Sequence, residues 1–164
     1  MKIEKDKLLK FIQSAKDQSW ATNQNQAQSP IPGTKLHTFQ DGDFFYYDIY
    51  GGFTAFSGTE MVLLRQEPVW FMSYHGQILG RALPRFDSYE DLKHFQNQIH
   101  DFLHRVLRRQ DVNDRFRGPP SVYEKPWEYE CEQNGNWMEF NGEERIYYDN
   151  DLICRCTFQG QIVL

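Results

Sequence analysis

Apolar residues recur at helical spacing in two stretches of the chain. Leu8, Phe11, Ile12 and Ala15 form the stripe of the first stretch, between about residues 5 and 20. The second stretch begins after Ser88, a residue type that caps helices, and its stripe comprises Tyr89, Leu92, Phe95, Ile99, Phe102, Leu103 and Val106. The sequence therefore predicts two amphipathic helices, each with one buried face.

After each helical stretch, apolar and polar residues alternate and glycines interrupt the pattern, which is typical of antiparallel strands joined by turns. Breaks rich in Pro and Gly, at 29–33 and 117–120, separate helix from strands. We predict strands at 44–49, 53–56, 59–64, 69–74 and 77–79, with counterparts 84 residues later. Tight turns are expected at 65–68 and 149–151.

The two strand regions resemble each other. Residues 44–79 align with 128–163 without a gap at an offset of 84, and more residues are identical than composition explains. The identical pairs are Gly51/Gly135, Phe56/Phe140, Gly58/Gly142, Glu60/Glu144, Gly76/Gly160, Gln77/Gln161 and Ile78/Ile162. We predict an α+β fold in which a helix-plus-antiparallel-meander unit is duplicated with pseudo-two-fold symmetry around a shared β-rich core. Residues 1–164 would form one domain from two repeat units, 1–84 and 85–164.

Aligning the two units separates the faces of the sheet. Positions apolar in both units predict the core face: Val62/Ile146, Leu64/Tyr148, Trp70/Cys154, Met72/Cys156 and Tyr74/Phe158. The opposite face is apolar only in the first unit, at Met61, Leu63, Val69 and Phe71. A helix or another subunit should cover it, and we consider a homodimer through these residues.

Composition narrows the classes of partner. Lys and Arg total 18 against 23 Asp and Glu, and the net charge of −5 disfavours direct binding to nucleic acid. No apolar run is long enough to cross a membrane, so we expect a cytoplasmic protein.

The three cysteines contain no CxxC pair, which indicates a reducing compartment. At the offset of 84, Cys131, Cys154 and Cys156 replace Tyr47, Trp70 and Met72, so we expect small, buried and reduced core residues.

Glu60 and Glu144 are the most suggestive pair of acidic residues. A two-fold axis would bring them together to share a proton or clamp a cation or metal; alternatively, each accepts hydrogen bonds within its own turn. No matched acid, base or nucleophile accompanies them, so we assign no catalytic residues. His100 and His104 have helical spacing for zinc but no third ligand, so we prefer a solvated helix face to a metal site. We therefore expect neither metal nor cofactor.

Aromatic residues, 16% of the chain, exceed the need of a small core. We predict a non-catalytic binding module that holds a small molecule in a cleft between the repeats, through Trp70, Tyr74, Arg117, Glu60 and Glu144. One alternative is a protein-interaction module, such as an inhibitor, an immunity-type protein or a homodimerising domain. A second alternative is an enzyme that uses the Glu60/Glu144 pair.

Several short motifs resemble a known bacterial family in their order and spacing. They are Tyr47-Asp48, Gly51-Gly52-Phe53, Phe56-x-Gly58-x-Glu60, Pro68-Val69-Trp70, Phe116-Arg117-Gly118-Pro119 and Phe140-x-Gly142-x-Glu144. Together they are similar to the domain of unknown function 5680, from about Leu9 to Ile162. The resemblance implies a bacterial cytoplasmic protein and no particular activity, although relatives sometimes follow a helix-turn-helix domain, as effector-binding modules do.

Overall fold

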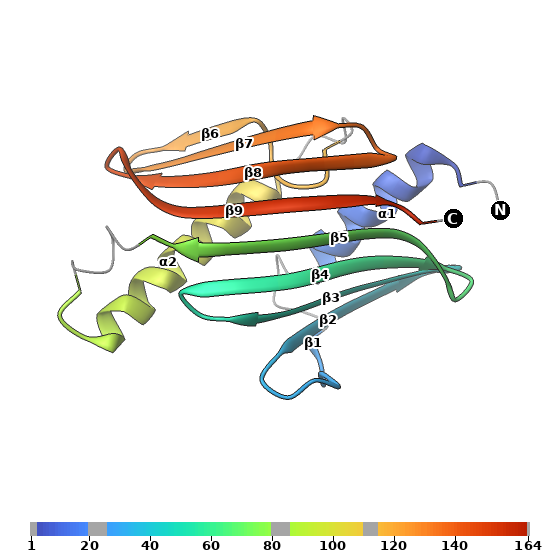
Figure 1. The fold of residues 1–164 in the computed structure, drawn as a ribbon, viewed down its shortest axis with the longest axis horizontal. Helices are drawn as coiled ribbons and strands as arrows, with labels where there is room; N and C mark the ends of the chain where they lie inside the picture. Colours follow the sequence, from blue (N-terminus) through green and yellow to red (C-terminus); the bar gives the residue numbers. More distant parts are fainter. Residues whose placement is uncertain (1–2, 20–25, 80–85, 110–114, 164) are drawn as a thin grey trace.

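One antiparallel sheet dominates the computed structural model, which describes residues 3–19, 26–79, 86–109 and 115–163. Within these ranges the sheet has nine strands in the order β1-β2-β3-β4-β5-β9-β8-β7-β6. Helices α1 (Lys5–Gln18) and α2 (Tyr89–Leu107) both lie behind the sheet in Figure 1. The strands are β1 (Gln26–Ala27), β2 (Lys35–Asp41), β3 (Phe44–Gly52), β4 (Ala55–Leu64), β5 (Glu67–Ile78), β6 (Ser121–Glu124), β7 (Trp127–Gly135), β8 (Glu139–Tyr148) and β9 (Asp151–Ile162). The predicted α+β class is confirmed.

Both helices form where the apolar stripes predict them. The four stripe residues of α1 are all buried, and Phe11 stacks on Phe44 of β3 with 5.0 Å between ring centroids. In α2 the Ser88 Oγ accepts a hydrogen bond of 3.1 Å from the Asp91 N–H, so Ser88 is the expected N-cap. The helix that we expect to reach Trp20 ends at Gln18, and Trp20 lies outside the described residues.

The strands are longer than predicted, because some glycines lie within strands and do not end them. Gly76 is an interior residue of β5, and a Cβ there would lie 2.5 Å from Cζ of the Phe56 ring. Gly160 of β9 makes the same room for the Phe140 ring, at 2.4 Å. Glycine here allows an aromatic ring to lie against the backbone, so the predicted breaks near these positions are wrong.

The two predicted tight turns are present. Arg65 and Gln66 have φ of 54° and 71°, and Asp149 and Asn150 have φ of 49° and 66°. Positive φ at both central residues is the geometry of the two-residue turn that matches strand twist. After the first turn, Val62 pairs with Trp70 and Leu63 with Pro68, so Val69 is an extra residue in a bulge. Val69 is fully buried, which corrects its assignment to the outer face of the sheet.

The uniform offset of 84 is wrong for the first strand of each meander. β4 and β5 recur 84 residues later as β8 and β9, but β3 begins at Phe44 and β7 at Trp127, 83 residues later. Pairing agrees, since Tyr46 faces Val62 whereas Tyr129 faces Ile146. The turn between β7 and β8 is one residue longer than that between β3 and β4. A short insertion in a turn leaves the pairing of the strands on either side intact. The pattern of apolar residues alone does not show where such an insertion lies.

This shift changes two equivalences. Gly52, with φ of 107°, matches Gly135, with φ of 89°, so Gly51 is not the counterpart of Gly135. Cys131 lies where the first meander has Asp48, and not where it has Tyr47. Asp48 and Cys131 are both buried.

The core face of the sheet is the one predicted. Among its residues only Leu64 and Tyr148 are partly exposed, and the others are buried: Val62, Trp70, Met72, Tyr74, Ile146, Cys154, Cys156 and Phe158. The three cysteines are free and buried, as expected.

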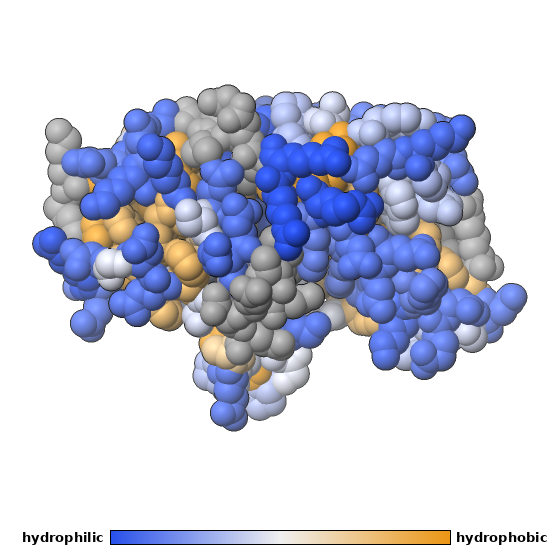
Figure 2. Space-filling model, turned by 180° about the vertical axis from the view of Figure 1, so that it is seen from behind, coloured by the Kyte–Doolittle hydropathy of each residue, from blue (hydrophilic) through white to orange (hydrophobic). Residues whose placement is uncertain are grey.

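On the outer face, no described helix covers the side chains of Phe45, Tyr47, Met61, Leu63 and Phe71, which are half-buried. Figure 2 shows the helix-bearing face, which is mostly hydrophilic with apolar patches towards both sides. Neither of the described helices is long and apolar enough to cross a membrane.

Candidate functional site

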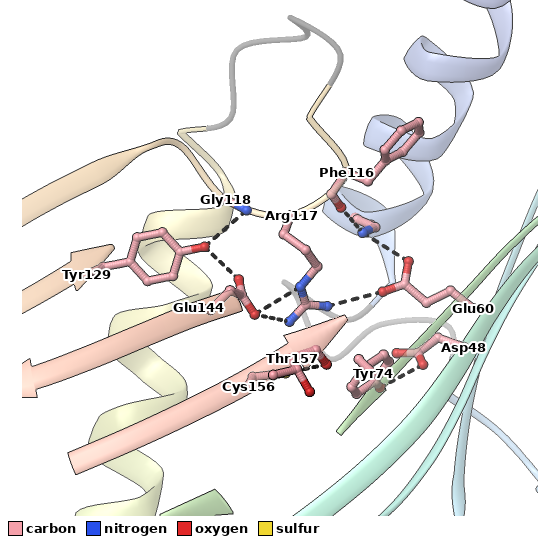
Figure 3. Close-up of polar contacts among 11 residues, drawn as sticks. Asp48, Glu60, Tyr74, Phe116, Arg117, Gly118, Tyr129, Glu144, Cys156 and Thr157 are labelled. Carbon is pink, nitrogen blue, oxygen red and sulfur yellow. Dashed lines mark hydrogen bonds and ion pairs between the residues drawn. The ribbon is translucent and has the colours of Figure 1, made fainter. Parts of the chain in front are cut away.

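A buried charged cluster lies where α1, the segment before β6 and the sheet meet (Figure 3). At its centre, Arg117 Nε and Nη2 contact Glu144 Oε2 of β8 at 3.0 and 2.7 Å. Arg117 Nη1 contacts Glu60 Oε1 of β4 at 3.3 Å. One guanidinium therefore joins the two glutamates, which explains why both β4 and β8 carry a buried acid. This geometry differs both from a direct carboxylate pair and from two separate turn acceptors.

Each glutamate also has a second partner on its own side of the cluster. Lys16 Nζ of α1 lies 2.9 Å from Glu60 Oε2 and also donates to the Phe116 carbonyl. The Tyr129 hydroxyl donates to Glu144 Oε1 at 2.6 Å and accepts from the Gly118 N–H at 3.1 Å. These contacts fix the segment around Arg117 from both sides, so the cluster is a rigid structural element.

Asp48 of β3 is a third buried carboxylate, directly opposite Glu60 in the strand register. Its Oδ1 accepts a hydrogen bond of 2.9 Å from the Tyr74 hydroxyl, and no Lys or Arg in the described ranges forms an ion pair with it. Burial, and then the negative charge of Glu60, raise the pKa of Asp48 to about 7. The charges of Arg117 and Lys16 oppose this rise without forming an ion pair with Asp48, so Asp48 is the least compensated charge of the cluster.

Burial acts against the charge of both cations, and the neighbouring carboxylates oppose it. Burial lowers the pKa of Lys16, while the neighbouring Glu60 opposes that effect. Burial also disfavours the charged form of Arg117, but the charges of Glu144 and Glu60 raise the pKa of Arg117 well above its usual value. Three carboxyl groups therefore face two cations within one buried volume.

A cavity of about 320 Å³ opens beside this cluster, between α1, α2 and strands β3–β5. Its apolar wall comprises Phe53, Phe56, Ile78, Ile99, Leu103 and Leu107. Its polar end comprises Lys16, Tyr46, Asp48, Glu60, Tyr74 and Arg117. The exposed side chains of Lys35, Lys93 and His100 lie at its rim. Apolar walls with a few convergent polar groups are the usual form of a small-molecule site.

Three of the five predicted site residues, Glu60, Tyr74 and Arg117, line this cavity. Glu144 lies behind Arg117 and contacts the cavity only through it. Trp70 is not part of the lining: it is fully buried, and its ring lies 5.4 Å from that of Phe116 and 6.1 Å from that of Phe140. The other predicted aromatic, Tyr74, holds the Arg117 guanidinium over its ring at 5.1 Å.

Sequence reasoning missed Lys16 and Asp48, although each left a signal. Lys16 follows Ile12 by four residues and so lies on the buried stripe of α1. Asp48 follows Phe44 and Tyr46 at the spacing of a buried strand face. A charged residue in either position requires a buried partner or a function.

His100 and His104 gain no third metal ligand in the part of the chain that the structure describes. No group of three or more His, Cys, Asp or Glu side chains in the described part of the chain could hold a metal ion. Burial, followed by the charge of His100, lowers the pKa of His104 to about 4, so the ring is neutral at physiological pH. The zinc interpretation of His100 and His104 thus gains no third ligand.

Comparison with known proteins identifies the family and nothing more specific. No curated protein and no solved structure matches the chain. A family model described as a domain of unknown function, DUF5680, matches residues 48–163. The match begins at Asp48 and includes Glu60, Arg117 and Glu144, whereas Lys16 precedes it. The chain therefore belongs to the DUF5680 family.

Proposed function

We propose that this protein is a non-catalytic binding module that holds a small molecule in the cavity between α2 and strands β3–β5. The observation that carries the proposal is a cavity of about 320 Å³ with an apolar wall and a rigid charged end. Such a volume suits a metabolite-sized ligand. We expect a bacterial cytoplasmic protein, as the family resemblance implies.

The contacts and the protonation of the polar groups favour binding over catalysis. The carboxylates of Glu60 and Glu144 contact Lys16, Arg117 and Tyr129, so neither is placed to exchange a proton with a ligand. Cys154 also lines the cavity, but burial raises the pKa of its thiol to about 12. A protonated thiol is a poor nucleophile. The enzyme alternative built on the Glu60/Glu144 pair is therefore disfavoured.

Native mass spectrometry of the purified protein tests the proposal. We expect a bound small mass that is released on unfolding. Leu103→Trp, which fills the apolar wall, should lose that mass. Met61→Trp introduces the same indole on the outer face of the sheet and should keep it. Ligand-free protein throughout, with no binding from a metabolite library in solution, would contradict the proposal.

We also infer that the chain arose by internal duplication, with its halves related by a pseudo-two-fold axis between β5 and β9. Helix α1 starts at Lys5 and α2 at Tyr89, an offset of 84 that β4/β8 and β5/β9 repeat. Phe11 stacks on the first residue of β3 as Phe95 does on Trp127, the first residue of β7. Bulges recur at Val69 and Ile153. Their shared geometry supports common descent more strongly than the sequence identities do.

Divergence of the two halves would have left a ligand site in only one of them. In the second meander, Cys131 replaces Asp48 and Phe158 replaces Tyr74. The second half therefore lacks the acid and the hydroxyl that form the polar end of the cavity. On this basis, we place the site over the first meander under α2, and not on the symmetry axis.

A second candidate function is a protein interaction through the outer face of β3–β5. Half-buried Phe45, Tyr47, Met61, Leu63 and Phe71 lie there without a described helix over them. An apolar patch of this kind often marks an interface. If a homodimer forms through it, Leu63→Lys should give monomers by light scattering at the same protein concentration, while ligand binding in the cavity should persist.

A further inference from the structure

The charges around the cavity do not balance. Glu60 has Lys16 and Arg117 as ionic partners, and Glu144 shares Arg117. Asp48 has the neutral Tyr74 hydroxyl and no ion-pair partner among the described residues. Asp48 lines the cavity and is only 3% exposed, so its buried charge lies beside the space that a ligand would occupy. A buried carboxylate without a cation is costly, so its presence beside a cavity indicates a missing positive charge.

Aromatic side chains form much of the cavity lining. Tyr46, Tyr50 and Tyr74 lie near Asp48, and Phe53 and Phe56 belong to the apolar wall. Arg117 already lies over the Tyr74 ring, which shows that an aromatic face in this environment accommodates a cation. Carboxylate and aromatic groups together recognise amines and quaternary ammonium ions, whose charge is diffuse and easily desolvated.

We propose that the cavity binds an organic cation, a protonated amine or a quaternary ammonium group on an apolar body, with its charged nitrogen against Asp48 and its body along Phe53, Phe56 and Leu103. The proposal rests on the cavity being a binding site, and it adds the chemical class of the ligand. The bound nitrogen supplies the third positive charge of the cluster.

The exposed lysines at the rim of the cavity favour an anionic ligand. Lys35 and Lys93 could attract a carboxylate or phosphate, but both are exposed to solvent, where their fields are screened. The charge of Asp48 is buried and acts at low dielectric, so it should dominate the selection. An anionic ligand held by Lys93 is the competing outcome of the test.

The test uses three probes with one body: phenylbutyltrimethylammonium, phenylbutanol and phenylbutanoate. Titration calorimetry with the full chain near pH 8 should show the ammonium binding at least about tenfold tighter than the other two. Asp48→Asn should remove this preference, and phenylbutanol should bind the variant and the wild type alike. Asp41→Asn, an exposed acid outside the cavity, is the matched control and should retain the preference.

The quaternary probe does not titrate, so its pH dependence reports on the protein. Proton and cation compete for the Asp48 carboxylate, and with its pKa of about 7 the affinity should fall about tenfold from pH 8 to pH 6. The other groups that face Asp48 are Glu60, Tyr74, Arg117, Lys16, Tyr46 and Tyr50. Burial lowers the pKa of His100 at the rim. Asp48→Asn should abolish the pH effect.

Any other result would contradict the inference, and each result contradicts a different part of it. Equal binding of the three probes, or tighter binding of phenylbutanoate that Lys93→Gln weakens, excludes a cationic ligand but leaves the binding module intact. An ammonium preference that survives Asp48→Asn removes Asp48 as its cause. If no probe binds at millimolar concentration, the cationic class is wrong. If, in addition, no small mass co-purifies with the protein, the binding module itself is also wrong.

Discussion

Asp48 and Arg117 are buried charges in opposite situations. Arg117 makes three contacts to two carboxylates and lies over an aromatic ring, so its charge is compensated within the protein. Asp48 has a single neutral hydrogen-bond donor. The first arrangement holds the fold together, whereas the second costs stability in the absence of a ligand. This contrast yields two predictions at the scale of single residues.

Asp48→Asn should stabilise the ligand-free protein in a pH-dependent manner. The pKa of Asp48 is raised in the folded state, from the ordinary value of 3.8 to about 7, so the folded protein binds an extra proton between these pH values. Ionisation of Asp48 should therefore lower the stability of the wild type, by roughly 2 to 4 kcal/mol as pH rises from about 4 to 7, relative to a variant without this carboxyl group. Asn stays neutral and can still accept the Tyr74 hydrogen bond, so the variant should escape this loss. Urea unfolding at a series of pH values measures the difference, and parallel stability curves would refute it.

Arg117→Ala should destabilise the protein by about 3 to 5 kcal/mol, because it leaves the buried carboxylates of Glu60 and Glu144 without their shared cation. Arg65→Ala is the matched control, since Arg65 pairs with Asp43 at 2.8 Å but its side chain is 75% exposed. That change should cost no more than about 1 kcal/mol. Chemical unfolding of both variants near neutral pH provides the comparison. Equal effects would show that the buried cluster contributes little.

Part of this site was accessible from the sequence. Glu60, Glu144 and Arg117 were predicted to converge, but their roles were not, because the sequence does not show that a guanidinium lies between the glutamates. Trp70 is an aromatic residue of the kind that often contacts ligands, but the structure places it in the core. An aromatic side chain serves packing and binding equally well, and only its position relative to a cavity separates the two.

At the scale of elements, turn length determines which residues correspond. The turn after β3 has two residues and the turn after β7 has three, which moves β3 and β7 by one residue relative to the constant sequence offset. Helices, long strands and hairpin turns were predicted from periodicity, since burial of one face imposes it. Strands β1, β2 and β6, on the two sides of the sheet, were not predicted. β1 has two residues and β6 has four, which is too short for a periodic pattern, and the burial pattern of β2 shows little alternation.

Gly52 provides a test of this turn. It has φ of 107°, and a Cβ at this position would lie 2.1 Å from the Ala55 carbonyl oxygen. Gly52→Ala should therefore cost at least about 3 kcal/mol through both backbone strain and overlap. Gly33 has a positive φ of 81° but nothing within 4 Å of the added Cβ, so Gly33→Ala should cost about 1 to 2 kcal/mol. Thermal unfolding distinguishes the two, and equal losses would remove steric overlap as the cause.

At the scale of the whole molecule, three features connect the two halves. β5 and β9 pair from Trp70/Ile162 to Ile78/Cys154, in the centre of the sheet. Helix α2 crosses behind this junction (Figure 1) and contacts both halves. Its Gln96 side chain donates to the Phe53 carbonyl at 2.9 Å, and its Phe102 ring lies 5.3 Å from Trp127. Arg117 adds the buried charged link.

The chain should consequently unfold as one unit, although its halves resemble each other. Residues 1–84 alone would expose β5 as a long apolar edge and lose α2, and residues 85–164 alone would expose β9 in the same way. We expect each fragment to be unfolded by circular dichroism, and the full chain to show coincident urea transitions by circular dichroism and tryptophan fluorescence. A mixture of the fragments should regain strand signal, because the β5–β9 pairing and the α2 contacts can form between chains. A fragment that folds alone, or a biphasic transition of the full chain, would mean that the halves are independent domains, and a cavity built from β3–β5 and α2 could then open without global unfolding.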